Sequence, residues 1–181
     1  MFKSVQILNK KTEYFDWVDL HDQVIGVTSR EDAHQLYLFH RAVHLYARGE
    51  KGGLILQKRS LSKDLEPGVW TVSCSGHVDR GESYEEAAVR EMNEELGVSI
   101  VSPDLCDLLH SGPSCGNGYE FVRSYEVSQP ICPVADPSEI SDLCELGLKE
   151  IDQWIKEEPQ AFASSFHCLF PLARKKFRWI T

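Results

Sequence analysis

The sequence predicts an α/β domain in which a mixed β-sheet is clasped between helices. Segments with strand-like alternation are interspersed with helical segments along the whole chain, as is typical of this class. The chain has 181 residues, 42% of them apolar, which is enough to bury about 70% of its unfolded surface around one core. No repeat, low-complexity stretch or linker interrupts it, so we expect a single domain over residues 1–181.

The N-terminal third is expected to be mostly β-structure. Trp17 to Val27 alternates about a polar centre at His21-Asp22 and predicts a hairpin, after which Ser29 to Asp32 opens a short helix. Ala42 to Arg48 and Gly53 to Lys58 predict two strands joined by a glycine-rich turn.

A strand followed by a capped helix is predicted in the middle of the chain. Val69 to Ser75 is β-branched and aromatic, which favours a strand that delivers its C-terminal end to the helix. Ser83 and Glu86 have the spacing of a capping box. The run from Tyr84 to Leu96 contains neither Pro nor Gly, and Gly97 is suited to end the helix.

The C-terminal part is expected to complete the sheet and its helical cover. Tyr119 to Val127 alternates and predicts a strand, Leu143 to Leu148 a further strand, and the region near Ile151 to Glu157 a helix. Cys106 to Gly118 is rich in glycine and is predicted to be a loop.

Residues 76–98 carry the pattern G-x5-E-x7-R-E-U-x-E-E-x-G-U, where U is apolar, with every position filled. Glu91, Glu94 and Glu95 fall within an arc of about 100° on the predicted helix. Like charges at this spacing repel by about 0.2–0.5 kcal/mol per pair unless a cation neutralises them. Mg²⁺ prefers carboxylate oxygens and is usually completed by substrate phosphates, so the pattern predicts a metal site. The alternative is an ordinary solvated acidic helix face.

Other residues of this pattern have positional tasks. Glycine at Gly76 permits its carbonyl to turn toward the metal and the backbone to approach a phosphate. Arg90 is expected to pair with Glu82 across the junction between loop and helix, which fixes the loop without taking part in the chemistry.

The complete motif resembles that of the Nudix hydrolases. Members of that family cleave nucleoside diphosphates linked to another moiety with Mg²⁺ or Mn²⁺, and the resemblance implies their α/β/α sandwich. Further segments resemble the branch that contains type I isopentenyl-diphosphate isomerase, and the similarity spans about residues 16–170. These segments are Gln57-Lys58-Arg59-Ser60, Lys63-Asp64, Pro67-Gly68-Val69-Trp70-Thr71 and Cys74-Ser75-Gly76-His77.

The resemblance also implies residues that bind substrate or metal outside the motif. Arg59 and Lys63 match positions that bind the diphosphate, where Arg suits a bidentate contact and Lys a point-charge contact. Glu120 matches an acidic position that supplies an additional metal ligand or a base, with Glu126 as the alternative on the same strand face.

Histidines form a second implied group of ligands. His40 and His77 resemble two metal ligands of the isomerase branch, and His34 lies one residue from the place of a third. For each of them, a packed or solvated histidine without a metal is the alternative.

The sequence is compatible with three functions, of which two are enzyme activities and one is ligand binding without catalysis. The isomerase branch uses a cysteine directly before its Gly-His pair, whereas this chain has Ser75 there and Cys74 one residue earlier, pointing to the other side of a strand. The tail from Pro159 to Phe166 resembles the closing segment of the isomerase, but Ser165 stands at the tryptophan position. We therefore favour a hydrolase, with isomerase and a non-catalytic ligand-sensing module as alternatives.

The predicted reaction is attack of water on one phosphorus of a diphosphate. Mg²⁺ or Mn²⁺ would be held by the carboxylates of Glu91, Glu94 and Glu95 and by the carbonyl of Gly76. Either Glu91 or Glu120 would act as general base, and the sequence leaves this choice open.

Composition limits the partners. The net charge of −9 argues against binding a nucleic-acid polymer and leaves a small-molecule diphosphate as the expected partner. No apolar run has the length of a signal peptide or a membrane span, so we expect a cytoplasmic protein. The six cysteines show no zinc spacing and are expected to be reduced. The oligomeric state is left open.

Overall fold

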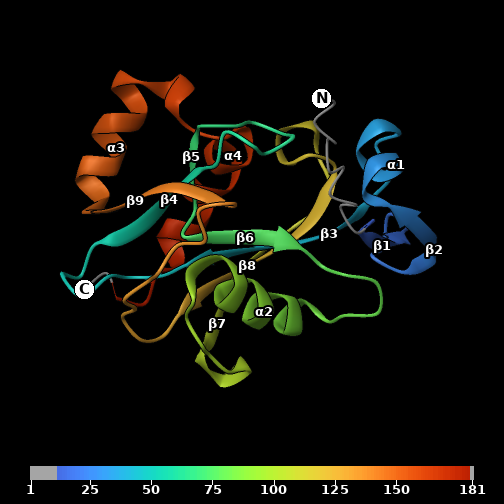
Figure 1. Cartoon of the computed structure of the whole chain (residues 1–181), viewed down its shortest axis with the longest axis horizontal. Coiled ribbons are helices and arrows are strands. Elements are labelled where there is room, and N and C mark those ends of the chain that lie inside the picture. Colours follow the sequence, from blue (N-terminus) through green and yellow to red (C-terminus); the bar gives the residue numbers. More distant parts are fainter. Residues whose placement is uncertain (1–11, 180–181) are drawn as a thin grey trace, which may run out of the picture.

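A four-stranded mixed sheet forms the centre of the computed structural model, which describes residues 12–179 (Figure 1). Its order is β6-β3-β8-β7; β3 and β8 are parallel, and the two outer strands are antiparallel to their neighbours. The strands are β3 (His40–Tyr46), β6 (Cys74–His77), β7 (Leu105–Ser111) and β8 (Glu120–Val127).

Two smaller sheets flank the central one. The first has the order β5-β4-β9 and is antiparallel. The second is the antiparallel hairpin β1-β2, followed by α1 (Arg30–Gln35), whose N-cap is Ser29 as predicted. The strands are β1 (Tyr14–Val18), β2 (Val24–Ser29), β4 (Leu54–Arg59), β5 (Trp70–Thr71) and β9 (Ile140–Leu146).

The segment Val69 to Ser75 is not one strand, which corrects the prediction. It divides into β5, which pairs with β4, and β6, which pairs with β3. The hydroxyl of Ser73 accepts a hydrogen bond from the amide of Ala47 at 2.9 Å and donates one to the carbonyl of Ile55 at 2.6 Å. The segment therefore crosses from one sheet to the other, because β-propensity favours a strand without specifying its partner.

Helix α2 (Tyr84–Leu96) begins and ends as predicted. Ser83 and Glu86 form a full capping box, and Gly97 ends the helix at φ 62°, in the left-handed region that favours glycine. Ala88, Met92 and Leu96 are buried in the same core cluster as Val43 and Leu45 of β3. The acidic side chains thus lie on a helix that is anchored to the central sheet.

The opposite face of the central sheet is covered by α4 (Ser164–Ala173), so that β3 lies between α2 and α4 (Figure 1). Tyr46 of β3 stacks on Phe170 of α4, and Ala42 packs with Leu169. Helix α3 (Leu148–Glu157) contributes to the same core through Ile151. Residues 12–179 also contain four short 3₁₀ helices: η1 (Ser102–Asp104), η2 (Cys115–Asn117), η3 (Pro159–Ala161) and η4 (Arg174–Lys176).

Most predicted elements are confirmed with small shifts of their ends, as is the α/β sandwich class. One further correction concerns Cys106 to Gly118, where residues through Ser111 belong to β7 and only the remainder forms a loop. All six cysteines are free thiols. Within residues 12–179, no helix combines the length and the apolar character needed to cross a membrane.

Candidate functional site

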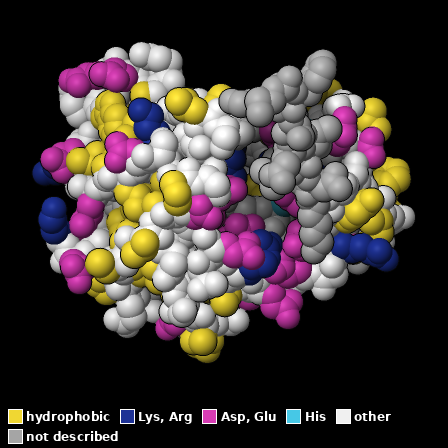
Figure 2. Space-filling model, viewed as in Figure 1, with side chains coloured by type: hydrophobic (Ala, Val, Ile, Leu, Met, Phe, Trp, Pro, Cys, Tyr) yellow, Lys and Arg dark blue, Asp and Glu magenta, His cyan; other side chains and the backbone are white. Residues whose placement is uncertain are grey.

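A cavity of about 710 Å³ opens beside the second half of α2 and the end of β6. Figure 2 shows acidic side chains gathered around a hollow, with basic side chains beside them. Its lining includes members of two groups that the sequence singled out, with His40 buried behind the lining. We call Glu91, Glu94 and Glu95 the glutamate patch, and His34, His40, His77 and Glu120 the histidine group.

The three carboxylates of the glutamate patch differ in exposure. Glu95 is buried and accepts a hydrogen bond from the side-chain amide of Gln57 at 3.1 Å. The carboxylate of Glu91 is mostly buried and accepts from Arg90 at 2.7 Å, whereas Glu94 is exposed and lies 3.2 Å from the same guanidinium. All three line the cavity.

The electrostatics of the glutamate patch fit a divalent cation. Burial raises the pKa of Glu91 to about 8, and the neighbouring carboxylate of Glu95 adds to the shift; burial also raises the pKa of Glu95. Ionised, these carboxylates repel one another in a partly dry site, and a cation between them would remove that cost. The donor set is all oxygen, as hard Mg²⁺ or Mn²⁺ prefers.

Gly76 of β6 is packed directly against the glutamate patch. A Cβ at this position would lie 2.0 Å from Oε1 of Glu91, a distance that no side chain can occupy. Any side chain at this position would force the carboxylate of Glu91 to move from where it lies. The carbonyl of Gly76 as a metal ligand stays a prediction.

Arg90 ties the loop before α2 to the helix. Its guanidinium donates to the carboxylate of Glu82 at 2.9 and 2.8 Å, and to the carbonyl of His77 at 3.0 Å. The geometry is that of a bidentate clamp that holds the loop in place. Arg90 also lines the cavity.

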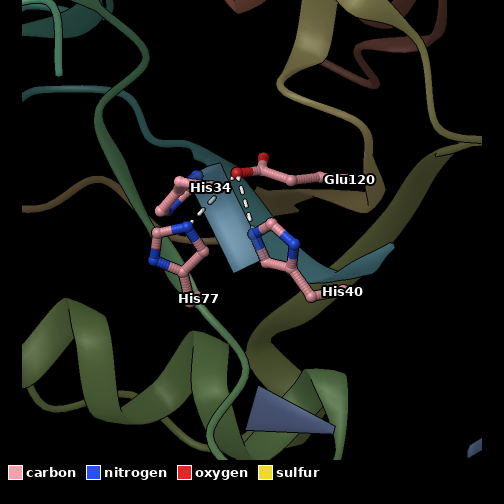
Figure 3. Close-up of side chains that lie close together, drawn as sticks. All are labelled: His34, His40, His77 and Glu120. Carbon is pink, nitrogen blue, oxygen red and sulfur yellow. Dashed lines mark hydrogen bonds and ion pairs between the residues drawn. The ribbon is translucent and has the colours of Figure 1, made fainter. Parts of the chain in front are cut away.

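The histidine group is assembled from four different elements (Figure 3). Its members each offer one ligand atom, and these atoms all lie within 4.8 Å of one another. Oε1 of Glu120 lies 3.2 Å from Nε2 of His77 and 3.5 Å from Nε2 of His40; the second distance is too long for a hydrogen bond. Among the described residues, this is the group of His, Cys, Asp or Glu side chains whose ligand atoms lie close enough together to hold one metal ion.

Burial and mutual contact determine the charges of the histidine group. Burial lowers the pKa of His34 to about 4 and lowers that of His77. Burial acts in the opposite direction on Glu120, but its contacts with the rings of His40 and His77 outweigh burial and bring the pKa of Glu120 below its usual range. Imidazole nitrogens beside a carboxylate are a donor set that metals such as Zn²⁺ and Mn²⁺ accept.

Arg59 and Lys63 both line the cavity, but much of their bonding capacity is already used. The guanidinium of Arg59 donates to the carbonyls of Leu65 and Glu66, at distances from 2.8 to 3.1 Å. Lys63 forms an ion pair with Glu139. Burial lowers the pKa of both cations.

The structure adds residues that sequence reasoning missed and separates others from the site. His44 is buried and lines the cavity; alternation along β3, which puts it on the same strand face as His40, was the signal that could have found it. Glu126 does not line the cavity, and its carboxylate instead accepts from the amide of Arg178 at 2.8 Å. The far wall is formed by Cys115, Gly116, Asn117, Gly118, Ser164 and Ser165.

Comparison with known proteins places the chain in a family. The model of the NUDIX domain matches residues 38–165. A curated relative from Serratia proteamaculans named isopentenyl-diphosphate Delta-isomerase is 44% identical over 151 residues, covering 82% of this chain and 84% of the relative. A Nudix hydrolase from Deinococcus radiodurans is 35% identical over 129 residues, covering 71% of this chain and 75% of the relative.

A solved structure supports the same assignment. The crystal structure of DR0079 from Deinococcus radiodurans has a TM-score of 0.72 and 30% sequence identity, covering 92% of this chain and all of that one. The fold, the motif at residues 76–98 and these similarities agree. The chain belongs to the Nudix family and lies in the branch that resembles the isopentenyl-diphosphate isomerases.

Proposed function

We propose that this protein is a metal-dependent hydrolase that cleaves the diphosphate linkage of a nucleoside diphosphate derivative or a related organic diphosphate. The observation that carries the proposal is the complete glutamate patch, anchored on α2 and opening into a cavity of about 710 Å³. Two of its carboxylates have raised pKa values, so their ionised forms are unfavourable in the metal-free site and would be stabilised by a bound cation.

Each group of the cavity has a task in this proposal. Glu91, Glu94 and Glu95 hold Mg²⁺ or Mn²⁺, with the carbonyl of Gly76 as a further ligand. When bound, the metal would neutralise the phosphate charge and lower the pKa of the attacking water. Arg59, at the end of β4, and Lys63, in the loop that follows, contact phosphate oxygens.

We favour Glu91 over Glu120 as the general base. A base works best when its pKa is close to the working pH. In the metal-free protein the pKa of Glu91 is raised to about 8, whereas contacts with His40 and His77 bring that of Glu120 below its usual range. Glu120 then serves as a ligand in the histidine group.

Isomerisation is the second candidate, favoured by the names of several curated relatives. Its proton donor in the branch precedes the Gly-His pair, and that position is Ser75, which lines the cavity. Cys74 is fully buried in the core with α2, and burial raises the pKa of its thiol. An isomerase reaction in this chain would therefore depend on the hydroxyl of Ser75.

The test is a panel of organic diphosphates with Mg²⁺, in which release of phosphate or mononucleotide is measured beside formation of dimethylallyl diphosphate. We expect hydrolysis of at least one nucleoside diphosphate derivative and no isomerisation. Isomerisation without hydrolysis would favour the second candidate. Binding of a diphosphate without turnover would indicate a ligand-sensing module.

A further inference from the structure

Arg30 contacts the histidine group from the first residue of α1. Its Nη1 lies 3.2 Å from Nδ1 of His77 and 2.9 Å from Oε2 of Glu13. A guanidinium carries only N–H groups and therefore can only donate. Nδ1 of His77 must accept this hydrogen bond, so it carries a lone pair and no proton.

This contact determines which nitrogen of His77 carries the ring proton. A neutral imidazole has one N–H, so the proton of His77 lies on Nε2 and is donated to Oε1 of Glu120 at 3.2 Å. His40 has the opposite arrangement. Its Nδ1 lies 2.8 Å from the carbonyl of Leu38, which can only accept, so the proton is on Nδ1 and the lone pair is on Nε2.

We propose that Arg30 competes with a metal ion for His77 and so controls the metal affinity of the histidine group. A metal ion bound at Nε2 of His77 displaces the proton there, and the ring keeps its one proton only by carrying it on Nδ1. That nitrogen would then present an N–H to the N–H of Arg30. The metal and the contact between Arg30 and His77 exclude each other, and metal binding requires Arg30 to move away.

His40 is already arranged as metal-binding histidines usually are. Its outer nitrogen donates to a backbone carbonyl and its inner nitrogen is free to bind, an outer contact that typically changes metal affinity by about 10–100-fold. In His77 the two nitrogens have the opposite roles. Because Arg30 donates to Nδ1, the proton lies on Nε2, the nitrogen that faces Glu120. The proposal concerns the histidine group alone and holds whether or not the glutamate patch supports hydrolysis.

Arg30→Met tests the proposal through metal affinity. We expect the variant to bind Zn²⁺ at least about tenfold more tightly than wild type, measured by competition with a chromophoric chelator. Arg30→Lys keeps a cation that only donates, and we expect it to stay close to wild type. Equal affinities of wild type and Arg30→Met would overturn the proposal.

Loss of a positive charge alone would also favour a cation, so a charge-matched control is needed. Arg123→Met removes a cation from β8 whose guanidinium lies over the ring of Tyr84 at 4.7 Å and does not line the cavity. We expect its Zn²⁺ affinity to change by less than about threefold. A gain equal to that of Arg30→Met would show that charge, and not the contact with His77, controls the affinity.

A direct readout needs no variant. Nitrogen-15 NMR of the imidazole rings in metal-free wild type distinguishes the protonated nitrogen of each histidine. We expect the proton of His77 on Nε2 and that of His40 on Nδ1. After Zn²⁺ is added to saturation, we expect the His77 proton on Nδ1. A His77 that carries its proton on Nδ1 before any metal is added would contradict the proposal.

Discussion

The glutamate patch and the histidine group share one cavity but neutralise their charges in different ways. The patch places three carboxylates on one helix, where Arg90 is the cation in contact with two of them. The histidine group places a single carboxylate, Glu120, among rings that stabilise its charge. From this difference we infer that the ionised patch would require a cation from outside, whereas the charge of Glu120 is stabilised within the histidine group.

As a result, the pKa values of Glu91 in the patch and Glu120 in the histidine group shift in opposite directions. Burial and like charge raise the pKa of Glu91, whereas contacts with two histidines lower that of Glu120. A raised carboxyl pKa means that the folded state prefers the protonated form, and a lowered one that it prefers the ionised form.

Removing one charge from the patch should affect turnover most. We expect Glu94→Gln or Glu95→Gln to reduce kcat by at least about 10², or about 2.7 kcal/mol of transition-state stabilisation, because the metal loses a charged ligand. The measurement is steady-state hydrolysis with saturating Mg²⁺. Glu85→Gln is the control, since it removes a carboxylate from α2 that does not line the cavity. Near-normal kcat in both patch variants would remove the patch from the mechanism.

Stability of the metal-free protein should fall as the patch ionises. The pKa of Glu91 is raised to about 8 in the folded state, so its contribution is present at low pH and lost as the pH rises toward 8. We expect the free energy of unfolding in EDTA to drop by at least about 1 kcal/mol between pH 5 and pH 8, and Mg²⁺ to restore it.

Glu91→Gln is the matched variant for this prediction. It removes the titrating carboxylate and should flatten the pH dependence, as measured by urea denaturation. A variant whose stability falls with pH as steeply as that of wild type would assign the loss to another group.

Glu120→Gln should show the opposite pH dependence. The pKa of Glu120 lies below its usual range in the folded state, so its stabilising contribution is present at neutral pH and lost as the pH falls. We expect the variant to lose about 1–2 kcal/mol at pH 7 and progressively less toward pH 3, because a buried hydrogen bond to a charged group is weakened. A loss that is the same at every pH would show that packing, and not charge, is responsible.

Ser75→Ala should have the smallest effect. Ser75 lines the cavity, but it has no task in the proposed hydrolysis. We expect kcat/KM for hydrolysis to change by less than about threefold, close to the effect of an ordinary surface substitution. A much larger loss would bring Ser75 into the reaction and strengthen the isomerase alternative, which gives it the role of proton donor.

Local features of the fold could be predicted from the sequence with good accuracy. The start and end of α2 follow from Ser83, Glu86 and Gly97, whose effects act within a few residues. The division of the Val69 to Ser75 segment between two sheets could not be predicted. Strand pairing depends on partners distant in the chain, and β-propensity is the same for either partner.

The grouping of the three carboxylates in the glutamate patch follows from the sequence alone, because helical periodicity places residues three and four apart on one face of a helix. The histidine group, in contrast, is brought together only by tertiary structure. The parallel pairing of β3 with β8 brings His40 beside Glu120, and the antiparallel pairing of β3 with β6 brings His77 beside Ala42. These registers are selected by burial of the sheet faces, a property of the packed chain that no local spacing encodes.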